Sequence, residues 1–174
     1  MKIPNNIKSQ VWEGKVLKYT EKDVNTDLLW PGRLTYGNFS MEEAISMGAM
    51  KGFDSDFFKK LEGRSILVVG ENFGCGSSRE QPSSFLRQIG INAVISPYFS
   101  RIFYRNSINA GLLVVESEEA SRLAKTDDYM MINPKDGRIT INRKAIEIQR
   151  YDDEIINILE RGGIIEYLSK MRRA

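Results

Sequence analysis

The sequence contains no histidine and only one cysteine, Cys75, among its 174 residues. Histidine is the commonest general base near neutral pH and a frequent metal ligand, so its absence excludes a Ser-His-Asp triad and a histidine-held metal. A single cysteine excludes an internal disulfide and also a self-contained zinc or iron–sulfur site, because such a site needs several thiolates. Any catalysis by this chain must therefore use Ser, Arg, Tyr, Lys or carboxylate groups, and we expect no metal held by the chain itself.

Long apolar runs and an excess of charge of one sign are also missing. No apolar stretch approaches the roughly 20 residues that cross a bilayer, and residues 1–10 lack the apolar centre of a signal peptide. The 25 basic and 23 acidic side chains nearly balance, which gives no support for phosphate-driven binding of nucleic acid. We therefore expect a cytoplasmic protein that binds neither membranes nor nucleic acid.

The second half of the chain has a regular rhythm of apolar and amphipathic segments. Short apolar segments alternate with helical patterns, which is typical of β-α-β units with parallel strands. After residue 127 the pattern changes to antiparallel strands around a turn at 134–137, then a helix or helix pair broken at Gly162-Gly163. The predicted strands lie at 66–70, 91–96 and 112–116, and the predicted helices at 79–90, 98–111 and 117–125.

The first 65 residues carry weaker patterns. Residues 11–19 alternate as a strand does, and residues 23–38 have the Asp, Asn, Pro and Gly chemistry of a loop. Ser40-x-x-Glu43 has the capping-box form that begins a helix, and a second short helix is expected within 52–63. With 41% hydrophobic residues, the chain predicts one α/β domain over residues 1–174, with a mixed parallel and antiparallel sheet flanked by helices.

The segment 70–85 has the sequence GENFGCGSSREQPSSF and directly follows a predicted strand. It contains the side chains that are the first candidates for a functional site. A glycine-rich loop between a strand and a helix points backbone N–H groups and the positive end of the helix at one place, which attracts an anion. Ser77, Ser78 and Arg79 would line that place, and the forked guanidinium of Arg79 suits a carboxylate or a phosphate. The spacing matches neither phosphate-binding glycine motif nor a nucleophile elbow.

A purely structural interpretation of the same loop is also open. Ser77-x-x-Glu80 and Ser78-x-x-Gln81 both have the capping-box form, and Pro82 is tolerated in a first helical turn. A cap needs one hydroxyl, however, and does not explain two adjacent serines or the Gly-Cys-Gly before them. We therefore expect a cap that also serves as an anion site.

Two further segments would add to this site if they fold toward it. Asn25-Thr26-Asp27 and the following Pro-Gly-Arg33 supply an acid and a second guanidinium; the plain alternative is an Asx turn and a surface arginine. Arg101 and Arg105 share a helix face close to Asn106, where a solvated stripe is the ordinary interpretation. Several arginines, serine hydroxyls and no metal ligands together indicate binding of a small polycarboxylate.

Three stretches of the chain resemble a known family. GENFGCGSSREQP, followed by GINAVISPYFSRIFYRNSINAGLLVV and later by GGIIEYL, is similar to the small subunits of 3-isopropylmalate dehydratases. These correspond to the swivelling C-terminal domain of aconitase-type hydro-lyases. DVNTDLLWPGRL near the start resembles the family's Asp-Thr-Asp loop with its Pro-x-Arg continuation. The similarity covers about residues 12–168 and is specific in its Gly-Ser-Ser-Arg-Glu string.

The resemblance implies a swivelling β/β/α fold and a partner. That partner is a large subunit, joined in a heterodimer or heterotetramer, whose three cysteines hold a 4Fe-4S cluster. The small subunit would bind no cofactor, and Cys75 would be a packing residue of the loop. The implied activity is a hydro-lyase that isomerises 2-isopropylmalate to 3-isopropylmalate by dehydration and rehydration in leucine biosynthesis.

The resemblance also implies roles for individual residues. Ser77 matches the serine that removes the proton next to a carboxylate, and Ser78 and Arg79 match the pair that binds the substrate carboxylate. Arg33 is a second candidate for substrate binding. The supporting residues are Asp27, Gly76 and Glu80, the last of which is expected to orient the loop or Arg79.

The segment after Arg33 is where the family contacts the variable group of its substrate. Here it is Leu34-Thr35-Tyr36, which matches neither the isopropylmalate nor the homoaconitate pattern. Because Leu34 and Tyr36 offer apolar surface, isopropylmalate is the first choice, and homoaconitate or a methyl-substituted malate such as citramalate or dimethylmalate is the second. The alternative of another class is a non-catalytic anion-binding module that has kept the fold and the serine loop.

Overall fold

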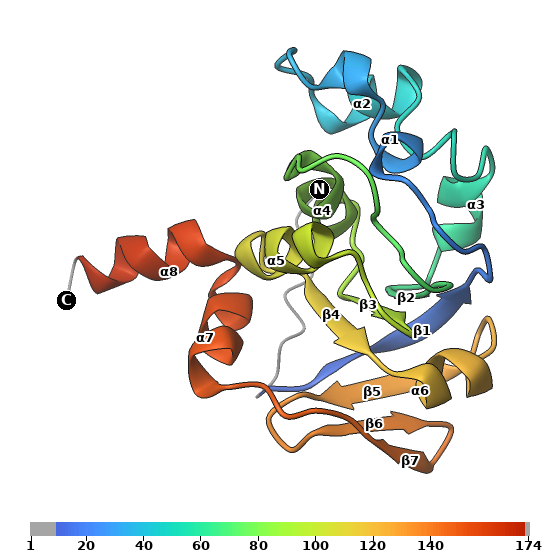
Figure 1. The fold of residues 1–174 in the computed structure, drawn as a ribbon, viewed down its shortest axis with the longest axis vertical. Helices are drawn as coiled ribbons and strands as arrows, with labels where there is room; N and C mark the ends of the chain where they lie inside the picture. Colours follow the sequence, from blue (N-terminus) through green and yellow to red (C-terminus); the bar gives the residue numbers. More distant parts are fainter. Residues whose placement is uncertain (1–9, 173–174) are drawn as a thin grey trace.

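The computed structural model describes residues 10–172, and its seven strands form one mixed sheet (Figure 1). The strands are β1 (Trp12–Lys18), β2 (Ile66–Val68), β3 (Ala93–Ser96), β4 (Leu113–Glu116), β5 (Tyr129–Asn133), β6 (Arg138–Ile141) and β7 (Lys144–Glu147). Their order across the sheet is β4-β3-β2-β1-β5-β6-β7. The predicted mixed sheet is thus confirmed.

Strand β1 joins the two halves of the sheet. On one edge it pairs in parallel with β2, with Val16 opposite Ile66. On the other edge it pairs antiparallel with β5, with Trp12 opposite Ile132. Every residue of β2 and β3 is buried, as expected for parallel strands inside a sheet covered on both faces. Alternation returns in β5, where Met130 and Ile132 are buried while Tyr129 and Met131 are exposed.

The helices follow the predicted pattern in the second half of the chain. They are α1 (Thr26–Leu29), α2 (Met41–Ser46), α3 (Phe57–Leu61), α4 (Gln81–Gln88), α5 (Arg101–Asn109), α6 (Glu118–Leu123), α7 (Asp153–Arg161) and α8 (Ile164–Met171). The capping box of α2 is confirmed, since Ser40 Oγ accepts from the Glu43 N–H and the Glu43 carboxylate accepts from the Ser40 N–H. The break between α7 and α8 is confirmed at Gly162, whose φ of 94° is left-handed.

One prediction for the first half was wrong. Residues 23–38 are not only loop, because they contain α1 and a 3-10 turn at Gly32–Leu34. Asn25 begins α1, its side-chain oxygen accepting from the Asp27 N–H at 2.9 Å. Four-residue helices lack the length that makes a helical period visible in a sequence.

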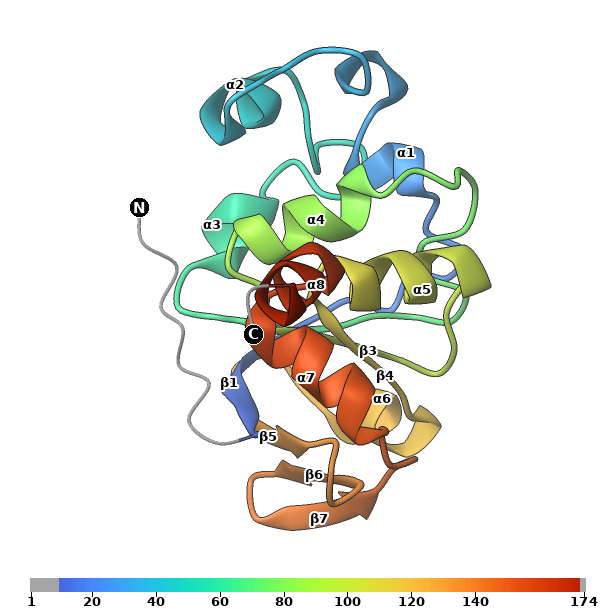
Figure 2. The same ribbon diagram turned by 90° about the vertical axis from the view of Figure 1, so that its left-hand side faces the viewer.

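The helices α1 and α2 lie together at one end of the molecule, and β6 and β7 lie at the opposite end (Figures 1 and 2). Helix α8 extends away from the body (Figure 1), and none of its residues is buried. Among the residues that the structure describes, no helix is both long and apolar enough to cross a membrane.

Candidate active site

The loops that follow β1 and β2 run side by side and bring together segments some fifty residues apart in sequence. Their backbones continue the parallel pairing beyond the strands. Asp23 N–H donates to Glu71 O at 3.0 Å, Gly74 N–H donates to Val24 O at 2.9 Å, and Thr26 N–H donates to Cys75 O at 2.8 Å. The carboxyl ends of adjacent parallel strands share one edge of a sheet, so loops that leave them can meet. The condition under which the Asn25-Thr26-Asp27 segment would add to the site, that it folds toward the serine loop, is therefore met.

Thr26 connects the start of α1 to the serine loop, residues 70–80. Its side chain is 2% exposed, and its Oγ1 accepts from the Ser77 N–H at 3.0 Å. The serine loop is further anchored by Phe73, which is fully buried and packs edge-on against Phe103 of α5 with ring centroids 5.3 Å apart. The backbone at Ser77 is therefore held from two sides, while Ser77 itself is half-buried and Ser78 is exposed.

Two glycines allow the serine loop to pass its neighbours closely. Gly74 has φ of 78°, and a Cβ there would lie 2.2 Å from the Phe103 ring. Gly76 has φ of 103°, and its Cβ would lie 2.6 Å from Asn25 Oδ1. Both the left-handed backbone and the lack of space require glycine at these positions. The Gly-Cys-Gly sequence thus has a packing reason that a helix cap does not supply.

Arg79 is held by an acid from the other loop. Its Nη1 lies 2.9 Å from Asp27 Oδ1, and the guanidinium passes over Gly32, where a Cβ would be 3.4 Å from Nη1. The Arg79 side chain is 30% exposed and that of Asp27 is 59% exposed. The guanidinium is therefore fixed by one ion pair while its remaining donors stay open to a ligand.

The capping boxes predicted for the serine loop are wrong. Helix α4 begins at Gln81 with Glu80 at the N-cap position, and no side chain caps it. Ser77 Oγ instead accepts from the Arg79 N–H, at a long 3.4 Å. Pro82 does lie in the first turn, as predicted. The uncapped N-terminus of α4 is thus left to favour an anion beside the serines.

One of the two roles expected of Glu80, the orientation of Arg79, belongs to another residue. The carboxylate bonded to Arg79 is that of Asp27, whereas Glu80 is exposed and makes no capping hydrogen bond. Its charge still lies at the positive end of α4, which is a favourable position. The residue that orients Arg79 is therefore Asp27.

The Arg33 side chain is hydrogen-bonded to the C-terminal end of α2. Its Nη2 donates to the Met47 carbonyl at 2.6 Å, at the C-terminal end of that helix. Gly48, with φ of 108°, leaves room for the guanidinium, because a Cβ there would lie 2.6 Å from Nη2. Arg33 is exposed, so its other donors face solvent.

The specificity segment after Arg33 divides between the core and the surface. Leu34 is 1% exposed and belongs to the core, so the expectation that it offers apolar surface to a ligand is wrong. Thr35 is half-buried, and its hydroxyl is buried without a hydrogen-bond partner in the described part of the chain. Tyr36 is 92% exposed. Of the three residues, Tyr36 is the one that presents apolar surface outside.

Cys75 is a packing residue of the loop rather than a reactive thiol. Its Sγ lies 3.2 Å from the Asp23 carbonyl. Burial, followed by the charge of Asp23, raises the pKa of the thiol, which opposes formation of the thiolate. Between residues 10 and 172, no three or more His, Cys, Asp or Glu side chains are grouped to hold a metal. Residues 10–172 therefore offer no set of ligands that fits an iron–sulfur cluster.

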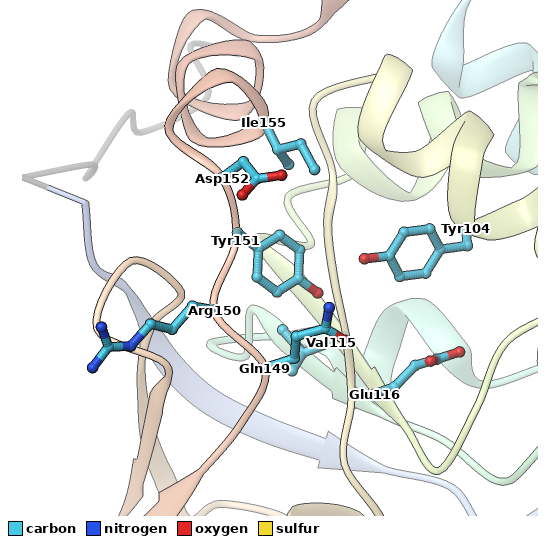
Figure 3. A pocket seen from close by; sticks show the side chains of 8 residues that line it. All are labelled: Tyr104, Val115, Glu116, Gln149, Arg150, Tyr151, Asp152 and Ile155. Carbon is cyan, nitrogen blue, oxygen red and sulfur yellow. The ribbon is translucent and has the colours of Figure 1, made fainter.

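A separate small cavity lies between β4, α5 and the segment before α7 (Figure 3). Its volume is about 100 Å³. The hydroxyls of Tyr104 and Tyr151 point toward each other, and Arg150 points away (Figure 3). Tyr151 donates to the Val114 carbonyl, and Glu116 accepts from the Phe99 N–H. The Tyr151 hydroxyl and the Glu116 carboxylate are therefore both engaged by the backbone of the fold.

Two residues of the site, Thr26 and Asn106, were not predicted from the sequence. Thr26 was counted as part of a turn, and Asn106 as part of a solvated stripe. Asn106 Nδ2 in fact donates to the Ser78 and Arg79 carbonyls, both at 3.0 Å. The capping signal at Asn25 could have placed Thr26 at a helix start, but no local pattern reveals a contact across 28 residues of sequence.

Comparison with known proteins agrees with this geometry. Residues 33–120 match the family described as the aconitase C-terminal domain, which defines the class of the protein. The chain is 39% identical to the 3-isopropylmalate dehydratase small subunit of Sulfurisphaera tokodaii over 160 residues, covering 91% of this chain and 94% of that protein. The corresponding subunit of Metallosphaera sedula is 38% identical, with 91% and 97% covered.

A solved structure shows the same fold. The crystal structure of 3-isopropylmalate dehydratase from Methanocaldococcus jannaschii aligns with a TM-score of 0.80 at 36% identity, covering 94% of this chain and 96% of that chain. The chain therefore belongs to the aconitase C-terminal domain family, within the group of 3-isopropylmalate dehydratase small subunits.

Proposed function

We propose that this chain is the small subunit of a hydro-lyase that isomerises 2-isopropylmalate to 3-isopropylmalate by dehydration and rehydration in leucine biosynthesis. The observation that carries the proposal is the serine loop itself, in which Ser77, Ser78 and the Asp27-held Arg79 stand together at an uncapped helix N-terminus. The similarity to small subunits of this dehydratase supports it. The cytoplasmic location expected from the sequence stays a prediction.

Arg79 and Ser78 would bind a substrate carboxylate. Arg79 offers a planar fork of donors that matches a carboxylate, and the ion pair with Asp27 fixes its direction before substrate arrives. Arg33, held at the end of α2, would bind the second carboxylate. Two arginines on separate elements suit a dicarboxylate better than a single anion.

Ser77 would take the proton from the carbon next to that carboxylate. A serine alkoxide is far too basic to persist in water, so it needs donors and a closed site. The Arg79 N–H already points at Ser77 Oγ, and the positive end of α4 and the Arg79 guanidinium add favourable charge. A hydrogen bond that is long in the absence of substrate can shorten when substrate binds.

The large subunit would close the site and supply what this chain lacks. Ser78, Asp27 and Arg33 are exposed, so the substrate would be covered only when a partner docks over them. A 4Fe-4S cluster held by three cysteines of that partner would act as a Lewis acid toward the substrate hydroxyl. The assembly would be a heterodimer or a heterotetramer.

The variable group of the substrate would lie near Tyr36. With Leu34 inside the core, the choice of an isopropyl group depends on Tyr36, on the partner and on the named relatives. Homoaconitate and methyl-substituted malates share the same reacting core, and an apolar pocket separates such groups by only about 1 to 3 kcal/mol per methylene. The relatives favour isopropylmalate over these alternatives.

The decisive experiment is reconstitution with a cluster-bearing large subunit. Absorbance of the unsaturated intermediate should rise on addition of isopropylmalate, and Ser77→Ala should abolish this while its unfolding free energy falls by at most about 1 kcal/mol. Ser84→Ala, a matched change within α4, should keep full turnover. Arg79→Lys should raise the Michaelis constant, because a point charge replaces the fork.

Two outcomes would overturn the proposal. One is normal turnover by Ser77→Ala. The other is the absence of turnover with isopropylmalate, homoaconitate and methyl-substituted malates, despite a loaded cluster. The second result would favour the non-catalytic anion-binding module.

A further inference from the structure

Helix α5 contacts the serine loop through one side-chain amide. Asn106 Nδ2 donates to the Ser78 carbonyl and to the Arg79 carbonyl, at 3.0 Å in each case. An asparagine amide has two N–H donors, so both bonds can form at once. Asn106 is half-buried; its bond to the Arg79 carbonyl is partly shielded from water, whereas its bond to the Ser78 carbonyl is exposed.

The helix that carries this amide is itself fixed on both sides of Asn106. Phe103, one turn earlier, packs edge-on against Phe73 at the base of the serine loop. Ser107, the next residue, shares a hydrogen bond of 3.0 Å with Ser83 of α4, and both hydroxyls are fully buried. The position of the Asn106 amide is therefore set by the packing of α5 against Phe73 and α4, and not by the two carbonyls that it holds.

Holding the two carbonyls also sets the direction of the donors that face the site. In a planar trans peptide, the carbonyl of one residue and the N–H of the next point in opposite directions. With the Ser78 carbonyl directed at α5, the Arg79 N–H is directed away from it, toward Ser77 Oγ at 3.4 Å. In the same way, the hydrogen bond to the Arg79 carbonyl sets the direction of the Glu80 N–H, because these two groups belong to one planar peptide.

We propose that Asn106 is a positioning residue for the reaction, which acts through the Ser78 and Arg79 carbonyls to direct the backbone N–H of Arg79 at Ser77 Oγ. This inference rests on the proposed function, in which Ser77 removes the substrate proton. The donor matters most when negative charge develops on Ser77, and less when the substrate merely binds. Loss of Asn106 should thus lower kcat more than it raises KM.

The test compares two substitutions at residue 106 with the same substitutions at residue 109. Asn106→Ala removes the donors, and Asn106→Asp keeps the size but presents oxygens to the two carbonyls. In the reconstituted enzyme at saturating large subunit, both should lower kcat roughly tenfold or more, with a smaller change in KM. Asn109 is exposed on the same helix, and Asn109→Ala and Asn109→Asp should keep kcat within about twofold.

A second measurement does not depend on turnover. Hydrogen exchange of the amides in residues 76–80 should be faster in Asn106→Ala than in the wild-type complex, and unchanged in Asn109→Ala. If kcat stays within twofold in both Asn106 variants while Ser77→Ala is inactive, the positioning role is wrong and the proposed function stands. A lower melting temperature with unchanged kcat would likewise overturn it, since that is a structural role. Normal turnover by Ser77→Ala would instead overturn the proposed function.

Discussion

The Nη1 atom of Arg79 lies 2.9 Å from Oδ1 of Asp27, although 52 residues separate them in sequence. The contact joins the start of α1 to the loop before α4, next to the Thr26 hydroxyl that accepts from the Ser77 N–H. The site is thus a property of two loops together, and the acid of one orients the arginine of the other. Both side chains are accessible enough to meet a ligand from outside.

Removing that acid should affect substrate binding more than folding. We expect Asp27→Ala to raise the Michaelis constant severalfold, because the Arg79 guanidinium loses its fixed direction. The unfolding free energy should change by only about 0 to 1 kcal/mol, as for other exposed ion pairs. Steady-state kinetics and chemical denaturation measure the two effects separately.

Another exposed ion pair provides the control. Lys144 Nζ lies 3.2 Å from Glu119 Oε1, with both side chains about half exposed. Glu119→Ala should cost similar stability and leave the Michaelis constant unchanged. An equal rise in the Michaelis constant for both variants would contradict a specific role for Asp27.

Gly76→Ala should destabilise the serine loop by about 1 to 3 kcal/mol. Part of this cost is the backbone, because φ is 103°, and part is the approach of a Cβ to 2.6 Å from Asn25 Oδ1. Gly90→Ala separates the two parts, since Gly90 has φ of 100° but nothing within 4 Å of its Cβ position. We expect the Gly76 variant to lose more stability than the Gly90 variant, and to lose turnover as well. Equal losses of stability, measured by thermal unfolding, would mean that the Asn25 side chain moves away from the added Cβ at little energetic cost.

The buried hydroxyl pair between α4 and α5 should show strong coupling. Ser83 and Ser107 are both 0% exposed and share a hydrogen bond of 3.0 Å. Either single change to Ala leaves one buried hydroxyl unpaired, which should cost about 1 to 3 kcal/mol. Ser83→Ala combined with Ser107→Ala should cost less than the sum of the two single changes. A double-mutant cycle by urea unfolding tests this, and additive losses would refute it.

Asp54 should contribute to the loss of stability in acid. Burial alone would raise the pKa of this carboxyl, but hydrogen bonds from Lys60, Tyr19 and the Asp56 N–H outweigh it and lower the pKa. A lowered pKa in the folded state means that the stabilisation is complete above the ordinary carboxyl value of about 4 and is lost as the pH falls through the folded value.

The measurement is the unfolding free energy of Asp54→Asn and wild type as a function of pH. The variant should be less stable near neutral pH, and the difference should shrink as the pH falls below about 4. Lys60→Met removes one of the donors and should reproduce part of the effect. Parallel acid limbs for wild type and Asp54→Asn would contradict the assignment.

Much of the fold could be predicted because its signals are local. Buried parallel strands such as β2 and β3 are continuous apolar runs, and the Gly162-Gly163 break needs only a left-handed cap. The short α1 shows no helical period because it has only four residues, so the capping residue Asn25 was the one local signal of its start. The burial of Leu34 could not be predicted either, since both Leu34 and Tyr36 carry large apolar surfaces in one short turn, yet Leu34 is 1% exposed and Tyr36 is 92% exposed.

The sequence by itself determined the chemistry that is available. Without histidine and with one cysteine, it limited any reaction by this chain to hydroxyl, guanidinium, amine and carboxylate groups, and its serine loop identified the place. The tertiary structure alone decided which groups meet there. It replaced a predicted helix cap with Thr26, Asp27 and Asn106, each from a different element than the loop they hold. The physical reason is that parallel strand ends and packed helices bring distant residues together, and such contacts leave no periodic trace along the chain.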